Sequence, residues 1–364
     1  MSNVPKDEKA GLASISWEDF HALGLAEKGD YLVQDGRELH VLIAQQFTRE
    51  RLDELGGLAT QIRFIAKSEA GMAFLRGLLP HKRVMLYFTQ PSTRTFLSFS
   101  AACQILGMRL GNVRDTATSS EFKGETQEDS VRTFSSYFDM IIMRTKEKGL
   151  AERMAWVLSN SERPVPIVNA GSGKDQHPTQ ALLDIYTLQR SFEQRDGIDG
   201  KKVVFVGDLA RGRTVRSLAW LLTSYNNVRQ AFVAPPELQL QDDLQQLLTK
   251  AGVEFELTQD FRAQIPTADA IYMTRIQDEW EPEGRTGKKG APYSFTVECL
   301  DLLKEDAIIM HPLPRRNEIS TEIDHDPRAM YWRQMRNGMW VRAALLASMF
   351  GCDARIREYF EKDV

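Results

Sequence analysis

Residues 83–107, "RVMLYFTQPSTRTFLSFSAACQILG", contain the pattern from which the fold class can be inferred. It opens with a mostly apolar run, residues 83–88, which is typical of a parallel strand buried on both faces. A polar gap follows, and a helical pattern starts at about residue 97. A strand that leads through a polar loop into a helix is the repeating unit of an α/β protein.

Short apolar runs of the same kind recur along the chain and alternate with amphipathic helical runs. The strand candidates are residues 83–88, 140–143, 165–170, 202–207, 230–234, 270–273 and 307–310. We therefore expect an α/β fold with two doubly wound parallel-sheet domains joined by interdomain helices, and an active site in the crevice between them. The helix expected over 177–192 is a natural bridge between the sheets, and the last helix, 340–350, can return to the first domain.

These patterns divide the chain into an N-terminal extension and two domains. Residues 1–40 are polar and weakly patterned, so their role is open, although "SWEDFHALGL" (16–25) predicts a short helix. The expected domain boundaries are 41–178 plus 337–364 for the first domain and 179–336 for the second.

Composition excludes several classes of protein. Charged residues make up 26% of the 364 residues and the net charge is −4, so nothing attracts the whole chain to nucleic acid or to an anionic membrane. No apolar run approaches the ~18 residues of a membrane span, and the N-terminal residues lack the apolar centre of a secretory signal. The scattered cysteines predict neither a disulfide framework nor a zinc site, which favours the cytoplasm. They are Cys103, Cys299 and Cys352.

Arginines follow four of the expected strands. They are Arg94, Arg144, Arg213 and Arg275. Open α/β sheets bind ligands at the carboxyl ends of their strands. Any one of these arginines can equally cap a strand or meet a surface carboxylate, but four at equivalent places favour a crevice for a small molecule with several negative charges.

The loop "PSTRT" (91–95) has the features of an anion site. Ser92, Thr93 and Thr95 supply hydroxyl groups beside the free N–H groups of a helix start, where the helix dipole favours an anion by ~0.3–2 kcal/mol. Arg94 adds a charge-assisted hydrogen bond worth ~1.5–3 kcal/mol. The alternative is an ordinary N-cap with spare hydroxyls. The chain has neither the nucleotide loop GxxxxGK[ST] nor a GxGxxG fingerprint, which weakens kinase and dinucleotide-binding readings.

Seven short motifs in this order resemble the aspartate and ornithine carbamoyltransferases, over roughly residues 41–360. The motifs are "PSTRT" (91–95), "KGET" (123–126), "MRT" (143–145), "QHPTQALLD" (176–184), "GDLARGRTVRSL" (207–218), "MTRIQ" (273–277) and "HPLPR" (311–315). "HPTQ", "TRIQ" and "HPLPR" look like the aspartate branch. The resemblance implies a transferase that needs no metal or organic cofactor and moves a carbamoyl group from carbamoyl phosphate to the amine of L-aspartate, in pyrimidine synthesis. The first domain would bind carbamoyl phosphate and the second aspartate.

The resemblance also assigns residues to carbamoyl phosphate. Thr95, Arg144 and His177 would be the catalytic donors to the carbamoyl oxygen, an effect typically worth ~3–4 kcal/mol per donor. A lone histidine is more often a core group with satisfied hydrogen bonds, but the place of His177 in "HPTQ" favours the catalytic role. The remaining contacts implied for carbamoyl phosphate are Ser92, Thr93, Arg94, Gln180, Leu313, Pro314, Ser119 and Lys123.

Aspartate would be held by arginines, because a dicarboxylate needs two cationic forks. The resemblance implies Arg213, Arg275 and Gln277 for its two carboxylates, with Lys123 also reaching it. In the family the loop that carries Ser119 and Lys123 enters a neighbouring subunit's site, which implies a homotrimer with shared sites. Read without the resemblance, that segment is an exposed loop with an ordinary lysine. A regulatory or dihydroorotase partner stays open.

Four positions depart from the family pattern. They are Gln90, Phe96, Ala210 and Trp280, where the family more often has charged residues. Gln90 and Trp280 together look like an ion pair lost at both ends, which avoids an unpaired buried charge. The chain is therefore expected to be an active enzyme with altered domain closure, lower aspartate affinity or weaker cooperativity. Two other hypotheses stay open: a carbamoyltransferase for another acidic or modified amino acid, and a non-catalytic family member that acts as an assembly subunit.

Overall fold

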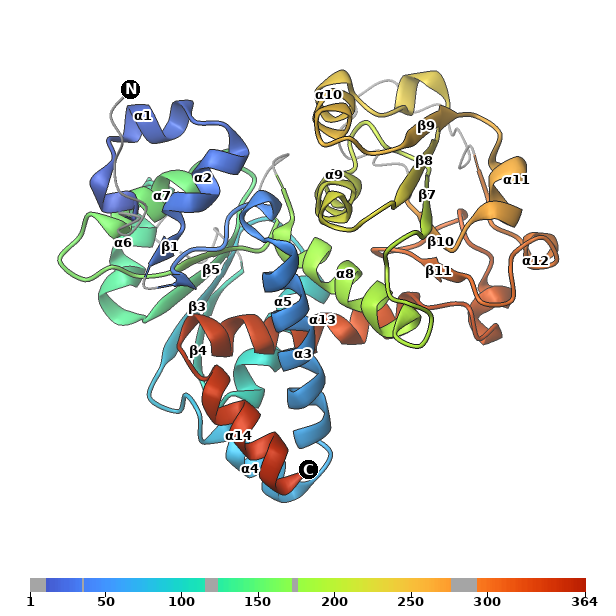
Figure 1. Ribbon diagram of the computed structural model, residues 1–364. Helices are drawn as coiled ribbons and strands as arrows, with labels where there is room; N and C mark the ends of the chain where they lie inside the picture. Colours follow the sequence, from blue (N-terminus) through green and yellow to red (C-terminus); the bar gives the residue numbers. More distant parts are fainter. Residues whose placement is uncertain (1–10, 35, 115–123, 172–175, 276–292) are drawn as a thin grey trace. The chain divides into compact units, whose positions relative to one another are not determined.

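The protein forms two compact α/β units. The first contains residues 1–182 and 338–364 and the second residues 183–337, so the chain passes between them within helices α8 (Pro178–Phe192) and α13 (Tyr331–Met349). Each unit contains a parallel sheet with helices around it (Figure 1). The computed structural model describes residues 11–34, 36–114, 124–171, 176–275 and 293–364.

The sheet of the first unit has the strand order β4-β3-β5-β6, and all its pairs are parallel. The chain runs from β3 outward to β4 and then returns to the other side of β3 with β5, so the topological switch point lies between β3 and β5. Its strands are β3 (Arg83–Phe88), β4 (Arg109–Val113), β5 (Met140–Arg144) and β6 (Ile167–Asn169). Their helices are α3 (Arg49–Ile65), α4 (Glu69–Arg76), α5 (Thr93–Ile105), α6 (Gln127–Tyr137), α7 (Leu150–Ser159) and α14 (Asp353–Asp363).

The sheet of the second unit has the order β11-β10-β7-β8-β9, again with parallel pairs only. Here the chain builds outward from β7 to β9 and then starts again beside β7 with β10, so the switch point lies between β7 and β10. Its strands are β7 (Lys202–Val206), β8 (Arg229–Val233), β9 (Phe255–Thr258), β10 (Ala270–Met273) and β11 (Ile308–Met310). Its helices are α9 (Arg213–Leu221), α10 (Asp242–Lys250), α11 (Phe261–Gln264) and α12 (Val297–Leu300).

The prediction of an α/β fold with two parallel sheets is confirmed, and all seven expected strands are present. The prediction missed β4 and β9, which are edge strands. Both are only partly buried, so their sequences, "RLGNV" and "FELT", lack the continuous apolar run of a strand covered on both faces.

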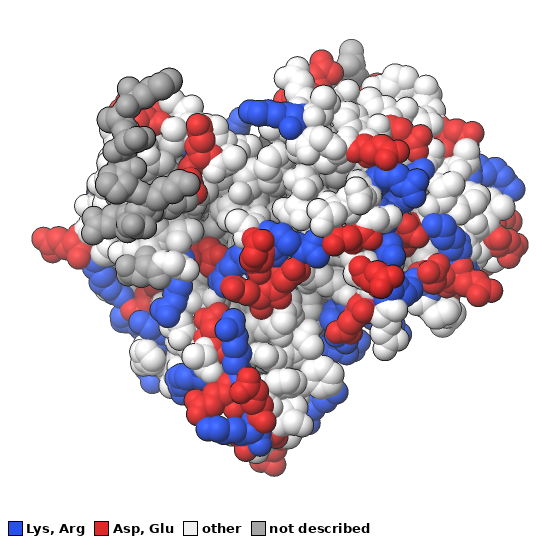
Figure 2. All heavy atoms as spheres, in the orientation of Figure 1, with Lys and Arg blue, Asp and Glu red and all other residues white. Residues whose placement is uncertain are grey.

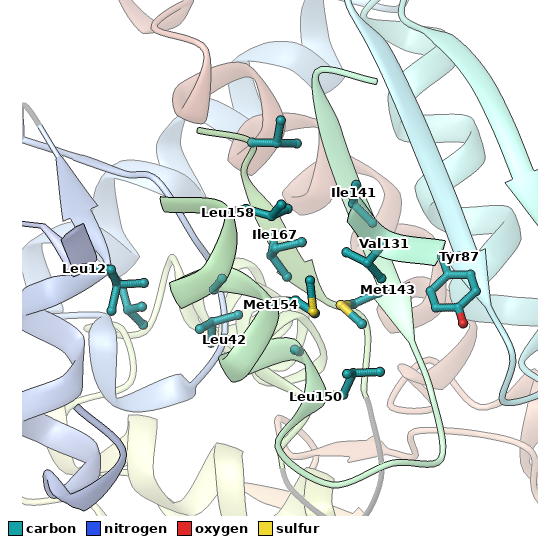
Figure 3. Close-up of a cluster of buried hydrophobic side chains, with 14 of the residues drawn as sticks. Leu12, Leu42, Tyr87, Val131, Ile141, Met143, Leu150, Met154, Leu158 and Ile167 are labelled. Atoms are coloured by element: carbon teal, nitrogen blue, oxygen red, sulfur yellow. The ribbon is translucent and has the colours of Figure 1, made fainter. Parts of the chain in front are cut away.

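The residues before the first family motif contribute to the core of the first unit. Helices α1 (Trp17–Ala22) and α2 (Leu25–Tyr31) are followed by a hairpin, β1 (Val33–Gln34) and β2 (Arg37–Glu38). Leu12, Phe20 and Leu32 are 0–1% exposed and belong to one hydrophobic cluster with side chains of α7, such as Met154 (Figure 3). Polar contacts also join the N-terminal segment to α7. Lys28 Nζ lies 2.5 Å from Glu152 Oε1, and Trp156 Nε1 donates to the Ile15 carbonyl at 2.9 Å.

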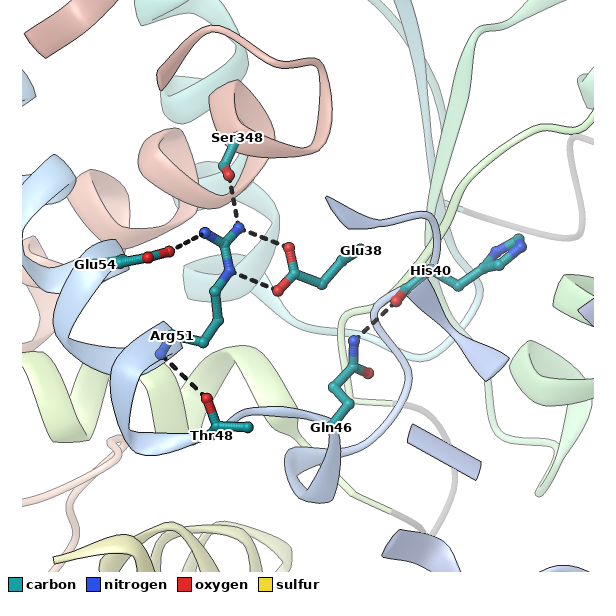
Figure 4. Close-up of polar contacts among 7 residues, drawn as sticks. All are labelled: Glu38, His40, Gln46, Thr48, Arg51, Glu54 and Ser348. Atoms are coloured by element: carbon teal, nitrogen blue, oxygen red, sulfur yellow. Dashed lines mark hydrogen bonds and ion pairs between the residues drawn. The ribbon is translucent and has the colours of Figure 1, made fainter. Parts of the chain in front are cut away.

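Arg51 on α3 connects three parts of the first unit (Figure 4). Its guanidinium donates two hydrogen bonds of 2.6 Å to the Glu38 carboxylate of β2, which is 5% exposed. It also donates to Ser348 Oγ on α13 at 2.6 Å and to Glu54 at 3.0 Å. Thr48 is the N-cap of α3, because its Oγ1 accepts the Arg51 N–H at 3.3 Å. A bidentate arginine–carboxylate pair of this kind fixes the hairpin against the helix.

His40 follows the hairpin and is fully buried as a neutral imidazole. Its Nδ1 accepts the Ile167 N–H at 3.0 Å, so the proton is on Nε2, which lies 2.8 Å from Ser159 Oγ. Burial lowers the pKa of His40 from 6.5 to about 3. A proton added to Nδ1 would point at the Ile167 N–H, which gives the same direction on geometric grounds.

We expect the free energy of unfolding to fall as the pH falls from about 6.5 toward about 3, because in this window the unfolded chain binds a proton at residue 40 that the folded chain excludes. The contribution is about 1.4 kcal/mol per pH unit. His40→Asn is the matched control, since its Oδ1 can still accept the Ile167 N–H and does not titrate. Urea titrations at pH 7 and pH 5 should show wild type losing about 2 kcal/mol more than His40→Asn. Equal losses would contradict the burial argument.

Candidate active site

The loop after β3 presents the N-terminus of α5 at the switch point of the first unit. Ser92 is the N-cap, and its side chain makes no capping hydrogen bond to the helix. The first N–H groups of a helix have no partner within it. Thr93 and Arg94 are exposed and Thr95 is 8% exposed. The local geometry therefore matches the anion loop expected from "PSTRT".

Arg144 and His177 lie together beside this loop. The parallel register pairs Phe88 with Arg144, and the Gln90 N–H donates to the Arg144 carbonyl at 3.1 Å, so the loop after β3 adjoins the end of β5. Arg144 Nη1 donates to the Ala170 carbonyl at 3.0 Å and lies 3.5 Å from His177 Nε2. Two of the three expected catalytic donors, Arg144 and His177, thus lie close together at one corner of the sheet edge. The third, Thr95, lies in the first turn of α5, which follows the neighbouring strand β3.

Gly171 keeps this corner open. Its φ is +98°, and a Cβ there would lie 2.7 Å from both Arg144 Nη1 and His177 Cδ2. Any larger residue would have to displace the guanidinium or the imidazole. The conformation and the space both require glycine.

Two amides that hold the segment before His177 were not identified from the sequence. The Asn169 side chain accepts the Gly171 N–H at 2.8 Å and donates to the Leu42 carbonyl at 3.1 Å. Gln176 accepts the Ala44 N–H at 2.7 Å and donates to Gln45 Oε1 at 2.7 Å. Both are buried, so they position the loop that carries His177. The only sign of this role in the sequence is their position: Asn169 is a polar residue within the strand candidate 165–170, and Gln176 begins the motif "QHPTQALLD".

Arg342 is a second group that the sequence reading missed. It is 3% exposed on α13, donates to Ser98 Oγ of α5 at 2.7 Å and lies 3.4 Å from Thr179 Oγ1 at the start of α8. Its guanidinium also lies 4.8 Å from the centre of the Phe99 ring. It thereby links the helix behind the anion loop to the helix behind His177. The signal that could have found it is a lone arginine inside the apolar run 340–350.

Phe96 is buried on one side, where a charged residue would be expected. Its ring meets the Phe88 ring edge-on at 5.4 Å, and the Arg114 guanidinium lies 4.3 Å from its centre. The aromatic side chain therefore closes the core beneath the loop and holds an arginine on its outer face by a cation–π contact.

In the second unit, Arg213 and Arg275 follow the two strands that flank the switch point. Arg213 starts α9 after β7, and Arg275 lies two residues beyond the end of β10. The Thr274 hydroxyl donates to the Val206 carbonyl at 2.9 Å, which ties the two strand ends together. Gly207, with φ +117°, lets them approach, because a Cβ would lie 2.3 Å from the Thr274 carbonyl oxygen.

Leu313 and Pro314 follow β11, which pairs with β10. They are joined by a cis peptide bond, and Leu313 has a φ of +56°. Gln180 lies in the first turn of α8 and is 9% exposed.

Several predicted residues cannot be placed. Ser119, Lys123, Gln277 and the departure Trp280 lie outside the described residues.

Within the described residues, no group of histidine, cysteine or acidic side chains could hold a metal ion, and no helix is long and apolar enough to cross a membrane. Lys and Arg side chains are interspersed with Asp and Glu over the face drawn in Figure 2.

These features define a class: a two-domain α/β protein with arginine-bearing loops at the switch point of each parallel sheet, suited to small anionic ligands. Residues 39–190 match the family model described as the aspartate/ornithine carbamoyltransferase carbamoyl-P binding domain, and residues 199–349 match its Asp/Orn binding domain. The chain belongs to the aspartate/ornithine carbamoyltransferase family.

Named relatives are similar over most of the chain. Aspartate carbamoyltransferase 1, chloroplastic, of Pisum sativum is 42% identical over 84% of this chain and 77% of that protein. The aspartate carbamoyltransferase catalytic subunit of Vibrio campbellii is 40% identical over 85% of this chain and 95% of that protein. Among solved structures, the catalytic subunit of M. jannaschii aspartate transcarbamoylase has a TM-score of 0.75 at 36% identity, covering 85% of this chain and 97% of that one. The Trypanosoma cruzi enzyme in complex with N-(phosphonacetyl)-L-aspartic acid has a TM-score of 0.73 at 36% identity, covering 85% and 94%.

Proposed function

We propose that this chain transfers the carbamoyl group of carbamoyl phosphate to the amino group of L-aspartate, giving N-carbamoyl-L-aspartate and phosphate, in pyrimidine synthesis. The observation that carries the proposal is the corner at the first switch point, where Arg144 Nη1 lies 3.5 Å from His177 Nε2 beside the N-terminus of α5. These surroundings support the proposal, because a helix start favours an anion and fixed donors stabilise a carbonyl oxygen that gains negative charge.

In the first unit, the α5 loop would hold the phosphate group through Ser92, Thr93, Arg94 and Thr95. Thr95, Arg144 and His177 would donate to the carbamoyl oxygen. When the aspartate amine attacks the carbamoyl carbon, a C–N bond forms and the oxygen takes up charge. The bond to the phosphate oxygen then breaks, phosphate leaves with the electron pair, and the amine loses its proton. Donors fixed before the reaction stabilise that charge without reorganising.

Gln180 and the Leu313–Pro314 segment would bind the carbamoyl NH2 group. Arg213 and Arg275, with Gln277, would pair with the two carboxylates of aspartate. Both arginines follow strands at the second switch point, and the proximity of these strand ends supports a shared ligand. An acidic acceptor fits two arginines, whereas the cationic side chain of ornithine would be repelled.

We also propose a cytoplasmic homotrimer in which Ser119 and Lys123 complete a neighbouring subunit's site. Higher assembly is open: one relative is the multifunctional protein pyr1-3 of Dictyostelium discoideum, of which this chain covers 13%. The departures at Gln90, Phe96, Ala210 and Trp280 would alter closure rather than chemistry, because the proposed substrate contacts are retained.

The deciding experiment incubates the purified chain with carbamoyl phosphate and a panel of amino acids, and identifies products by mass spectrometry. We expect N-carbamoyl-aspartate with L-aspartate and no product with ornithine, together with thermal protection by N-(phosphonacetyl)-L-aspartic acid. A product with a different acidic amino acid would move the proposal to that acceptor, and no product with any amine would leave a non-catalytic assembly subunit.

In the same assay, mixing chains disabled separately at Arg94 and Lys123 should restore some activity. Mixtures that stay inactive would contradict shared sites.

A further inference from the structure

His311, immediately after β11, makes a defined pair of hydrogen bonds. Its Nδ1 accepts the Leu313 N–H at 2.7 Å, and its Nε2 lies 2.8 Å from Glu318 Oε1. Because Nδ1 accepts a backbone proton, the ring proton is on Nε2 and donates to the Glu318 carboxylate. His311 is 1% and Glu318 2% exposed, so water does not compete for either contact.

The geometry agrees with the charge states. Burial lowers the pKa of His311, which favours the neutral ring that the Leu313 N–H requires. Burial alone would raise the pKa of Glu318, but the hydrogen bonds from His311 and from the backbone outweigh it and lower the pKa. A neutral imidazole next to an ionised carboxylate is therefore the resting state of the pair.

A second set of buried contacts holds the backbone of residue 311. The His311 N–H donates to Gln334 Oε1 at 2.9 Å, and Gln334 Nε2 donates to Asp184 Oδ1 at 2.7 Å. The Tyr272 hydroxyl donates to the other carboxylate oxygen of Asp184 at 2.8 Å. Gln334 lies on α13, Asp184 on α8 and Tyr272 on β10, so three elements of the second unit support one short segment.

Glu318 closes the segment from its other side. The Arg316 N–H donates to the same Glu318 Oε1 that His311 contacts, at 3.0 Å. Residues 311 to 316 are thus held at both ends by one carboxylate. Between these ends Leu313 adopts a φ of +56°, a conformation that a leucine rarely occupies unless its surroundings impose it.

We propose that His311, held by Glu318 and Gln334, is a positioning residue that fixes the Leu313 carbonyl so that the site distinguishes a carbamoyl group from an acyl group. The inference rests on the proposed function, in which this carbonyl accepts from the carbamoyl NH2. An acetyl group has a methyl in place of the NH2, and a fixed carbonyl that faces a methyl is left without a donor. A carbonyl free to turn toward water would lose that discrimination.

The test compares the dissociation constants of carbamoyl phosphate, acetyl phosphate and inorganic phosphate for the full chain by calorimetric titration. Wild type should bind carbamoyl phosphate at least about tenfold more tightly than acetyl phosphate. In His311→Gln the side-chain amide can reach Glu318 but offers Leu313 no acceptor at the Nδ1 position. This variant should lose about tenfold of the preference while its affinity for inorganic phosphate stays at the wild-type value.

Two matched variants separate positioning from general damage. His311→Asn places Oδ1 where Nδ1 lies and should keep the preference. Glu318→Gln retains an oxygen for both donors and should keep it as well. Glu318→Ala removes the partner of Nε2 and should reproduce the selective loss, so it decides the matter if His311→Gln does not fold.

An unchanged carbamoyl-to-acetyl ratio in His311→Gln or Glu318→Ala would overturn the inference. So would an equal loss of affinity for all three ligands, which indicates a purely structural role. These outcomes are distinct from failure of the proposed function. If wild type forms no N-carbamoyl-aspartate but the ratio changes as described, the function fails and the positioning role stands.

Discussion

Arg144→Gln is expected to lower kcat about 100- to 1000-fold, the effect of removing one donor to a developing oxyanion. The side chain is placed by its strand and by a hydrogen bond of 3.0 Å to the Ala170 carbonyl, and it lies beside His177. Glutamine is shorter and uncharged, so its amide does not replace the guanidinium donor. Since Arg144 is also a proposed contact of carbamoyl phosphate, the KM for this substrate should rise as well. Steady-state kinetics with both substrates varied measures the two effects.

Two controls make this result specific. Arg153 is a surface arginine of α7 that pairs with Glu128 of α6 at 2.9 Å. Arg153→Gln should leave kcat within twofold of wild type, since an exposed pair of this kind contributes little. Arg144→Lys keeps the charge without the planar fork and should fall between wild type and Arg144→Gln. A near-normal kcat for Arg144→Gln, with an unchanged melting temperature, would remove Arg144 from the chemistry.

Phe20→Ala is expected to lower the free energy of unfolding by about 3–5 kcal/mol, the cost of truncating a buried phenylalanine. Phe20 is 0% exposed, with the Tyr31 ring 6.2 Å away and Lys28 Nζ 5.3 Å from its centre. It belongs to the same cluster as the side chains of α7. Truncation would leave a cavity between the N-terminal helices and α7.

The matched control is Leu25→Ala, in the same segment but 37% exposed, for which we expect a loss below about 1 kcal/mol. Urea denaturation followed by fluorescence and by circular dichroism gives both values. If Phe20→Ala cost no more than Leu25→Ala, the N-terminal helices would not be packed against the rest of the first unit in solution.

The central strands and their loops could be predicted because burial on both faces imposes an unbroken apolar run. The run "RVMLYF" and its loop identify β3 and the start of α5 directly. Parallel strands also place their carboxyl ends on one edge, so Arg144, Arg213 and Arg275 could be expected at or after strand ends, where the structure has them. The pattern fails for β4 and β9, whose edge positions relax the demand for apolar residues.

The supporting groups could not be predicted, because their partners are distant in sequence. Arg342 meets Ser98 across 244 positions, and Gln176 meets Ala44 across 132. The periodicity of apolar residues along a helix or strand carries no information about such contacts. The same holds for the backbone N–H of His311, whose acceptor, Gln334, lies 23 positions further along the chain.

The N-terminal segment shows that the limits of the family match and the limits of the hydrophobic core differ in this chain. The family models match residues 39–190 and 199–349, and every proposed substrate contact lies within these ranges. Yet Phe20 and Leu32 lie before it, and on α14 beyond it Tyr359 stacks on Phe74 at 4.0 Å. A polypeptide cut at the family limits would keep its proposed chemistry and lose part of its hydrophobic core. For this chain the unit that acts is shorter than the unit that folds.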